Sequence, residues 1–352
     1  QIPGNTWTGL VTNNGTSGNV AAATKSDGTL WMWGSNSYGN LGQNALNPPS
    51  GTGVSSPVQV PGTTWSGASG KITTTSNHSA AIKTDGTLWM WGYGNRGVLA
   101  QNSNANYSSP AQVPGTTWNQ ISHDGSITIA TKTDGTLWTW GTNYAGKLGQ
   151  NETAGSPAFN AGAKSSPAQI PGTSWKWSAA GYDIMAATRT NGTLWVWGSN
   201  YYGSLGINSN TPTEYSSPIQ VPGTTWDKVQ CRGQAIGTSG MIASKTDGTL
   251  WAWGNNSAGV LGQNTDVGRH SSPVQITGTT WDEFCGVELN SAGALKTDGT
   301  IWSWGYNNNG QLGQNDRTSR SSPIQVGTDT NWTRVESAGK AMLGLKSVPS
   351  SS

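Results

Sequence analysis

A nine-residue stretch, in which a polar turn precedes a mostly apolar run with tryptophan at every second position, occurs six times along the chain. In the copy at 84–92, the polar turn Thr-Asp-Gly-Thr precedes Leu88, Trp89, Met90 and Trp91. Asp-Gly tolerates the positive φ angles of a tight hairpin turn, and the alternation puts both tryptophans on one face of a strand. The opposite face is also apolar, so the pattern predicts a strand covered by neighbouring sheets on both sides. The copies span residues 26–34, 84–92, 133–141, 190–198, 246–254 and 297–305.

The spacing of these copies predicts a repeat of roughly fifty residues. Residues 65–115 show one whole unit with four strand-like pieces, which begin at Trp65, Ser79, Leu88 and Ser108. Seven units begin with a tryptophan, at Trp7, Trp65, Trp118, Trp175, Trp226, Trp281 and Trp332. In the seventh unit, residues 347–352 replace the third strand, whereas residues 1–4 match the end of a fourth strand. We therefore expect the two termini to close the last unit together.

Periodic tryptophans are expected to fill the core, because each can bury roughly 150–250 Å² against the next sheet. The paired tryptophans predicted as structural core are Trp31, Trp33, Trp89, Trp91, Trp138, Trp140, Trp195, Trp197, Trp251, Trp253, Trp302 and Trp304. Together with the seven openers, they account for nearly all of the 20 tryptophans. We therefore do not expect them to act as ligand platforms.

The segments between the third and fourth strands vary most in length and content. Such loops on a fixed scaffold carry recognition in many proteins, although unconstrained surface is an equally good interpretation. The candidate partner-contact residues are Asn47, Tyr107, Phe159, Tyr215, Arg269 and Arg317. The expected partner is another structural protein or a cell-surface glycan or protein.

The composition argues against nucleic acid and membrane partners. Charged residues make up only 10% of the chain and the net charge is +2, so no basic field can hold a polyanion. No run of eighteen apolar residues is present, so we expect no membrane insertion. The 50 glycines and the lack of helix-favouring runs predict almost no helix.

We find no pattern for catalysis, a metal or a cofactor, and we predict none of the three. His78, His123 and His270 are scattered, without the close spacing that metal ligands need. One basic residue recurs in all seven units, and the choice lies between an anion-binding rim and solvated residues beside the turn aspartates. This set comprises Lys25, Lys83, Lys132, Arg189, Lys245, Lys296 and Lys346.

The repeated pattern A-x-K-T-D-G-T-L-W-x-W-G-x-N-x-x-G-x-L-G-Q-N, followed by S-S-P-x-Q-V-P-G, resembles the regulator-of-chromosome-condensation repeat family. The resemblance covers nearly the whole chain and implies a β-propeller of seven blades, in agreement with the seven units begun here. The near-verbatim Leu-Gly-Gln-Asn and Pro-Gly-Thr-Thr-Trp also resemble propeller segments in structural proteins of marine tailed phages. Family members include a nucleotide-exchange factor, an ultraviolet-B photoreceptor and a secreted β-lactamase inhibitor, so the fold alone does not define a function.

We thus predict an all-β, seven-bladed β-propeller with about four short antiparallel strands per blade, the last blade being incomplete and closed by both termini. Residues 1–346 form the single domain and residues 347–352 a C-terminal tail. The favoured function is a non-enzymatic phage virion component, structural or receptor-binding, which makes the expected location a virion or extracellular. The alternative is a secreted, protein-binding propeller of the inhibitor type. An enzyme with a channel site and a GTPase exchange factor are the less favoured options.

Overall fold

The computed structural model describes residues 6–12, 20–44, 53–152, 162–232, 239–287, 290–338 and 341–347. In these ranges the chain forms antiparallel strands and no α-helix. Three short 3-10 turns are also present, namely η1 (Asn95–Gly97), η2 (Tyr201–Gly203) and η3 (Ser257–Gly259). The prediction of an almost helix-free, all-β chain is confirmed for these residues.

Six sheets of four strands follow one another along the chain, and in each sheet consecutive strands pair. The first two are β1 (Trp7–Thr12), β2 (Val20–Lys25), β3 (Leu30–Gly34) and β4 (Val54–Gln59), then β5 (Ile72–Thr74), β6 (His78–Ile82), β7 (Leu88–Gly92) and β8 (Tyr107–Gln112). The next two are β9 (Trp118–Asp124), β10 (Ile127–Lys132), β11 (Leu137–Gly141) and β12 (Lys164–Ile170), then β13 (Trp175–Ala180), β14 (Ile184–Arg189), β15 (Leu194–Ser199) and β16 (Glu214–Gln220). The last two are β17 (Trp226–Arg232), β18 (Gly240–Lys245), β19 (Leu250–Asn255) and β20 (Arg269–Ile276), then β21 (Trp281–Val287), β22 (Ser291–Lys296), β23 (Ile301–Gly305) and β24 (Arg320–Gln325).

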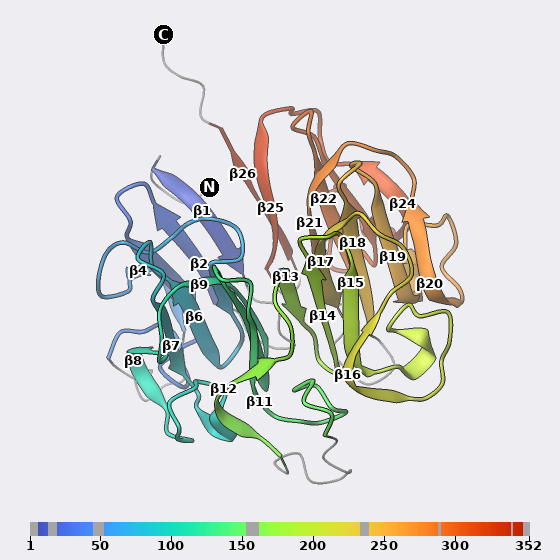
Figure 1. The fold of residues 1–352 in the computed structure, drawn as a ribbon. Helices are drawn as coiled ribbons and strands as arrows, with labels where there is room; N and C mark the ends of the chain where they lie inside the picture. The colour runs from blue at the N-terminus through green and yellow to red at the C-terminus, as the bar shows by residue number, and fades with distance from the viewer. Residues whose placement is uncertain are drawn as a thin grey trace.

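The remaining strands, β25 (Trp332–Ala338) and β26 (Ala341–Lys346), form a two-stranded hairpin. The first strands of successive blades contact one another, so they lie nearest the propeller axis. Strand β25 contacts both β21 and β1, and Figure 1 shows the red hairpin between the blue first blade and the orange last blade. The hairpin therefore stands between the two ends of the row of blades.

The predicted count of seven blades is wrong: the structure is a propeller with six four-stranded blades. The seventh unit gives only a hairpin because Ser347 follows β26 where the other units carry their Asp-Gly turn and tryptophan strand. The predicted contribution of residues 1–4 to closure lies outside the described residues. The same holds for residues 348–352 of the predicted tail.

Each blade packs on the blade before it through the second tryptophan of its pair. Nε1 of Trp91 donates to the backbone oxygen of Asn40 at 2.9 Å, and Nε1 of Trp197 donates to that of Lys147 at 2.7 Å. Trp140 and Trp304 make the same bond to Val98 and Val260. The alternation of the third strand thus fixes the interface between blades, because the register places these indoles on the face of the preceding sheet.

A second contact between blades joins the Gly-Gln-Asn turn to the Ser-Ser-Pro strand of the following blade. The backbone N–H of Asn44 donates to the Ser108 oxygen at 2.8 Å, and Asn264 donates in the same way to Ser321. The other three such bonds run from Asn102 to Ser165, from Asn151 to Ser216 and from Asn208 to Ser271. We call these five bonds the Asn–Ser clamps.

Candidate binding surface

The recurrent basic residues lie over tryptophan rings. The Lys83 ammonium is 4.8 Å from the ring centre of Trp65 and 4.6 Å from that of Trp89. Lys25, Lys132, Arg189, Lys245 and Lys296 likewise each cover two rings, whereas Lys346 lies over Trp332 at 4.3 Å. Cation–π attraction therefore gives this set a structural role in packing the repeat, which neither sequence interpretation had considered.

The turn aspartates act locally. Asp85 accepts hydrogen bonds from the backbone N–H and the hydroxyl of Thr87, and that hydroxyl accepts from Nε1 of Trp89 at 2.9 Å. The threonine bonds, aided by the charge of Lys83, lower the pKa of the Asp85 carboxyl below its ordinary value. The Asp-Gly-Thr sequence thus orients the first tryptophan of each pair.

The predicted core tryptophans divide into two groups. Trp91, Trp140, Trp197, Trp253 and Trp304 are fully buried between blades. Trp33 is half-buried, as are the first members of the pairs, Trp31, Trp89, Trp138, Trp195, Trp251 and Trp302. Within the half-buried group, the first members of the pairs carry the basic residues on their rings, and among the described residues no such contact is made by Trp33.

The six candidate contact residues lie in different settings. Asn47 and Phe159 lie outside the described residues. Tyr107 and Tyr215 are half-buried in strands β8 and β16, where they pack against the hydrophobic core rather than projecting from loops. Arg269 and Arg317 are exposed, on different blades. The structure therefore does not bring these residues into one site.

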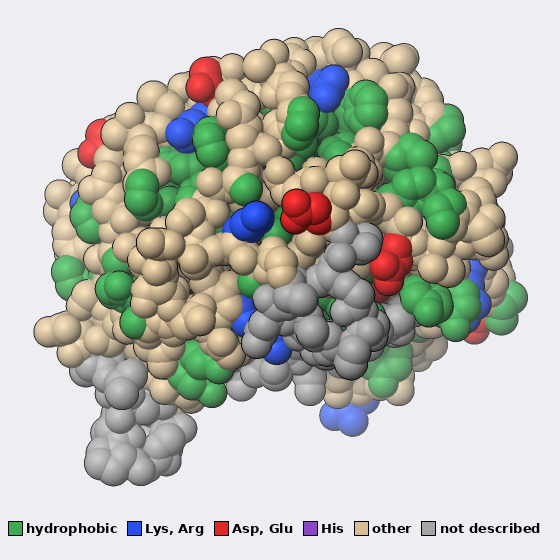
Figure 2. All heavy atoms as spheres, turned by 60° about the horizontal axis from the view of Figure 1, so that its bottom comes forward, with side chains coloured by type: hydrophobic (Ala, Val, Ile, Leu, Met, Phe, Trp, Pro, Cys, Tyr) green, Lys and Arg blue, Asp and Glu red, His purple; other side chains and the backbone are tan. Residues whose placement is uncertain are grey.

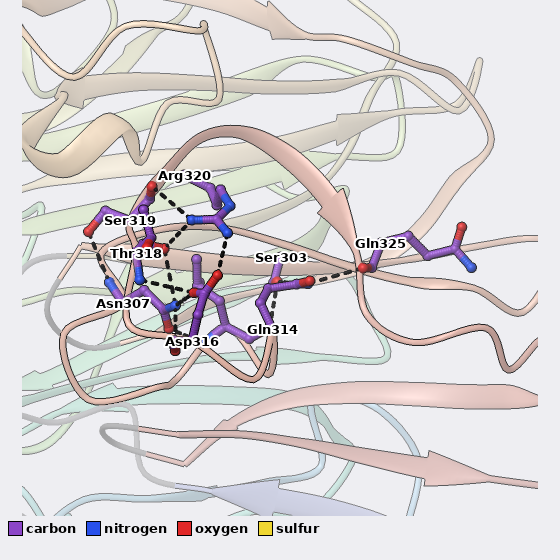
Figure 3. Close-up of polar contacts among 9 residues, drawn as sticks. Ser303, Asn307, Gln314, Asp316, Thr318, Ser319, Arg320 and Gln325 are labelled. Carbon is purple, nitrogen blue, oxygen red and sulfur yellow. Dashed lines mark hydrogen bonds and ion pairs between the residues drawn. The ribbon is translucent and has the colours of Figure 1, made fainter.

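The loop between the third and fourth strands is held by one asparagine in each of the last four blades. In the sixth blade, Asn307 donates from Nδ2 to the backbone oxygens of Asp316 and Thr318 and accepts from the Leu312 N–H at 2.9 Å. Figure 3 shows this loop folded over Asn307, with Arg320 paired to Asp316 at 2.5 Å. Asn143, Asn200 and Asn256 make equivalent bonds. The loops are thus anchored at their base, although their outer residues differ.

One exposed cluster stands out on the outer rim, where the loop of the fourth blade meets the fifth blade. Tyr201 and Tyr202 in η2 are 43% and 41% exposed, and Val267 is 70% exposed. The guanidinium carbon of Arg269 lies 3.2 Å from the ring centre of Tyr202. We call these four residues the rim patch.

The backbone presents the rim patch outward. Tyr202 has φ of 61°, the same left-handed turn that Arg96, Ala145 and Ala258 adopt in other blades. Sequence reasoning selected Arg269 but missed both tyrosines, because it searched after the glycine-rich turn and not within it. The variation of the two residues inside the repeated G-x-N-x-x-G was the available signal.

Buried ionisable groups gather at the end of the inner strands. Lys147 is fully buried, and its ammonium donates to the Tyr182 backbone oxygen at 2.7 Å. Burial raises the pKa of the Asp124 and Asp183 carboxyls, while the Lys147 charge acts in the opposite direction. Asp183 also accepts a hydrogen bond from the Ser239 hydroxyl. These bonds hold the turns that join the first and second strands.

His78 and His123 lie together, with ring centres 4.3 Å apart, and both are fully buried. Burial lowers the pKa of His78 to about 3 and lowers that of His123 well below its ordinary value. Both rings are therefore neutral at neutral pH. Nδ1 of His78 lies 3.2 Å from the Thr75 hydroxyl, so this histidine fixes a turn.

Two carboxyls face each other near the axis. Burial raises the pKa of Glu336 to about 7 against the opposing effect of Arg334, and the Glu283 charge adds to the rise. The cavity that Glu336 and Glu283 line with Lys228 measures about 20 Å³. That volume holds about one water molecule, whereas Glu336 also lines a second cavity of about 60 Å³ with Gln120 and Cys231.

No group of three or more histidine, cysteine, aspartate or glutamate side chains suited to a metal occurs among the described residues. Within the same ranges, no helix has the length and apolar character needed to cross a membrane. On the face drawn in Figure 2, acidic and basic side chains are scattered singly among uncharged ones. This face therefore carries no large patch of one charge sign.

The fold and the rim patch define a repeat β-propeller with an exposed aromatic surface. The model of the RCC1-like domain family matches residues 5–344, and the chain belongs to that family. Propellers of this family are commonly binding or regulatory domains.

Curated relatives match this chain over only part of their own lengths. The mitochondrial RCC1 domain-containing protein RUG3 of Arabidopsis thaliana is 26% identical over 82% of this chain and 63% of its own. The ultraviolet-B receptor UVR8 of the same plant is 31% identical over 43% of this chain and 34% of its own. The chain thus spans less than two thirds of these relatives.

Solved structures share the fold. Human WBSCR16 superposes with a TM-score of 0.79 at 16% identity, covering 99% of this chain and 89% of that one. Prp20p from Saccharomyces cerevisiae gives 0.76 at 17% identity, covering 95% and 82%. At these identities, the likeness concerns the fold alone.

Proposed function

We propose that this propeller is a non-enzymatic scaffold that binds another protein or a surface glycan through the rim patch. The carrying observation is the grouping of Tyr201, Tyr202, Val267 and Arg269, all exposed, across one interface between blades. Tyrosine and arginine are the residues that most often dominate binding energy at interfaces. Stacking of Arg269 on Tyr202 holds both side chains in place, which reduces the entropy lost on binding.

Named relatives support a binding role. The structure of Prp20p was reported together with the binding of that protein to Gsp1p and histones. Another relative is the human X-linked retinitis pigmentosa GTPase regulator, 28% identical over 44% of this chain but only 15% of its own length. Because the shared part is so small, we do not propose GTPase exchange for this chain.

For the biological setting, we propose a virion or an extracellular structure, in which the propeller serves as a structural or receptor-binding component. The low charge content and the Ser-, Thr- and Asn-rich loops support this setting. A secreted propeller of the inhibitor type is the alternative. Co-sedimentation with purified particles separates the two settings. Recovery of the protein only in the medium would contradict the virion setting, but it would not affect the proposal for the rim patch.

The binding proposal is tested with the double variant Tyr202→Ala/Arg269→Ala on a glycan array and in cross-linking to host-surface proteins. We expect the double variant to bind the ligands of the unaltered protein at least about tenfold more weakly, because two anchoring side chains have been removed. The matched control is Arg317→Ala, which removes an exposed arginine from another blade. Equal retention by the double variant and the control would refute the assignment of the rim patch.

A further inference from the structure

The outer edge of β26 is exposed, unlike that of every equivalent strand. The second strands β6, β10, β14, β18 and β22 are buried throughout, except for the final basic residue where it belongs to the strand. In β26, Met342, Leu343 and Leu345 are only half-buried and Gly344 is exposed. Among the described residues, no strand other than β25 pairs with β26.

A groove of about 200 Å³ runs beside this edge, between β26 and the loop of the sixth blade. We call it the β26 groove. Its relevant lining residues are Gln311, Gly313, Val326, Met342, Leu343 and Gly344. Figure 3 shows the neighbouring loop of the sixth blade, with Gln314 bonded to Gln325 along its base.

In the five interfaces between complete blades, the equivalent space holds the second tryptophan of the next blade. A side chain added to Gly42 would meet Nε1 of Trp91 at 3.0 Å, and one added to Gly262 would meet Nε1 of Trp304 at 3.3 Å. The same relation joins Gly149 to Trp197 and Gly206 to Trp253. At Gly313, Val326 is the only neighbour within 4 Å among the described residues, so no indole fills the space above this glycine there.

The β26 groove keeps the groups that receive a tryptophan elsewhere. The backbone oxygen of Val260, one residue before Leu261, accepts from Nε1 of Trp304 at 2.9 Å. Gln311 holds that position before Leu312 in the sixth blade. The Gln311 side chain is 5% exposed, and its Nε2 has no hydrogen-bond partner. A buried amide donor without a partner is costly, and a backbone carbonyl oxygen of an incoming segment would accept its hydrogen bond.

The basic residue of the hairpin, Lys346, covers one indole among the described residues, and its ammonium forms an ion pair with Asp329. Lys245 covers Trp226 and Trp251 at 4.7 and 4.3 Å, whereas Lys346 covers Trp332 and has no second indole within the described residues. The missing ring belongs to the first tryptophan of a third strand. Two independent features, namely the open space at Gly313 and the unpaired Gln311 side chain, therefore indicate room for the strand that fills the equivalent space elsewhere.

We propose that the β26 groove binds an extended peptide segment of the type Leu-Trp-x-Trp-Gly, supplied by another polypeptide and added antiparallel to β26. Exposed strand edges accept such segments through main-chain hydrogen bonds, and side-chain pockets select the sequence. The register of β14 with β15, in which Met185 faces Trp197 and Ala187 faces Trp195, transfers directly. It places the second tryptophan opposite Met342 and the first opposite Gly344.

The test uses the complete chain and a fluorescein-labelled peptide with the sequence of residues 84–92, Thr-Asp-Gly-Thr-Leu-Trp-Met-Trp-Gly. We expect saturable binding by fluorescence anisotropy at peptide concentrations below about 1 mM, and at least about tenfold weaker binding when the second tryptophan is replaced by alanine. Amide hydrogen exchange should slow in β26 when the peptide is bound. No saturable binding, or equal binding of the alanine peptide, would overturn the proposal.

Variants of the protein test whether the peptide binds in the β26 groove. Val326→Lys puts a charge into the groove and should weaken binding at least about tenfold. Met342→Lys, at a half-buried edge position, gives the same test if Val326→Lys fails to fold. The control Val267→Lys makes the same change at a position 70% exposed in the rim patch. Equal binding by the folded groove variants and the control would refute the site.

A separate measurement tests whether a second copy of this protein fills the β26 groove. Light scattering of the protein alone should show a monomer; a dimer dissolved by the peptide would mean that a second copy fills the β26 groove, contrary to the proposal. The groove shares no residue with the rim patch, so loss of peptide binding and loss of rim binding are distinguished by their own variants. Failure of one proposal therefore leaves the other standing.

Discussion

Replacing Glu336 by glutamine should change how the stability of the propeller depends on pH. Glu336 lies on β25 near the axis, and its side chain is 22% exposed. Burial is the main cause that raises its pKa to about 7, Arg334 acts in the opposite direction, and Glu283 adds to the rise. Lys228 also faces this carboxyl in the shared cavity. The glutamine keeps the shape of the protonated acid without its proton equilibrium.

The sign of the effect follows from proton binding. Between the ordinary pKa of 4.5 and the folded value of about 7, the folded protein binds more protons than the unfolded chain. The free energy of unfolding therefore falls as the pH rises through this window. The difference between these pKa values corresponds to about 3 kcal/mol, which for a chain of this length is ~4 °C in melting temperature.

The assay is thermal unfolding followed by tryptophan fluorescence at about pH 4 and about pH 8. We expect the melting temperature of Glu336→Gln to fall ~4 °C less than that of the unaltered protein between the two conditions. Glu214→Gln, at an exposed position on β16, is the control and should follow the unaltered protein. Parallel pH profiles of Glu336→Gln and the unaltered protein would refute the reasoning.

Two further predictions use differences between repeats. Trp197→Phe should destabilise the protein by about 1 kcal/mol more than Trp253→Phe in denaturant unfolding, because Trp197 donates to the Lys147 oxygen and the Trp253 indole has no partner; equal losses would contradict this. Lys83→Met should cost roughly 1–2 kcal/mol through its two ring contacts, whereas the same change at the exposed Lys164 should cost less than about 0.5 kcal/mol, and equal costs would remove the cation–π argument.

Local features of the repeat could be predicted from the sequence. The alternation after Asp85 and Gly86 identifies a turn and a strand, and the structure has β7 at Leu88–Gly92. The strand meander also follows from the four apolar pieces per unit. These features depend on neighbouring residues, so a linear pattern contains the information.

Features that join distant residues could not be predicted in the same way. The two rings under Lys83 belong to different strands, so their meeting depends on sheet register. The patch at Tyr202 and Arg269 forms across two blades, and its residues are 67 positions apart by their numbers in the sequence. The blade count was wrong because counting opening tryptophans treats a hairpin as equal to a full sheet.

The Asn–Ser clamps give the propeller a direction along its chain. Each clamp donor precedes its acceptor, so Asn208 gains its acceptor Ser271 only when synthesis reaches the fourth strand of the next blade. A blade at the growing end therefore has its loop unsecured until its successor emerges. Deleting N-terminal blades would leave serine acceptors without their asparagine donors. Deleting C-terminal blades would leave asparagine donors without their serine acceptors. We therefore expect the blades to fold in order from the N-terminal blade onward, because each new blade supplies the clamp acceptor for the blade before it.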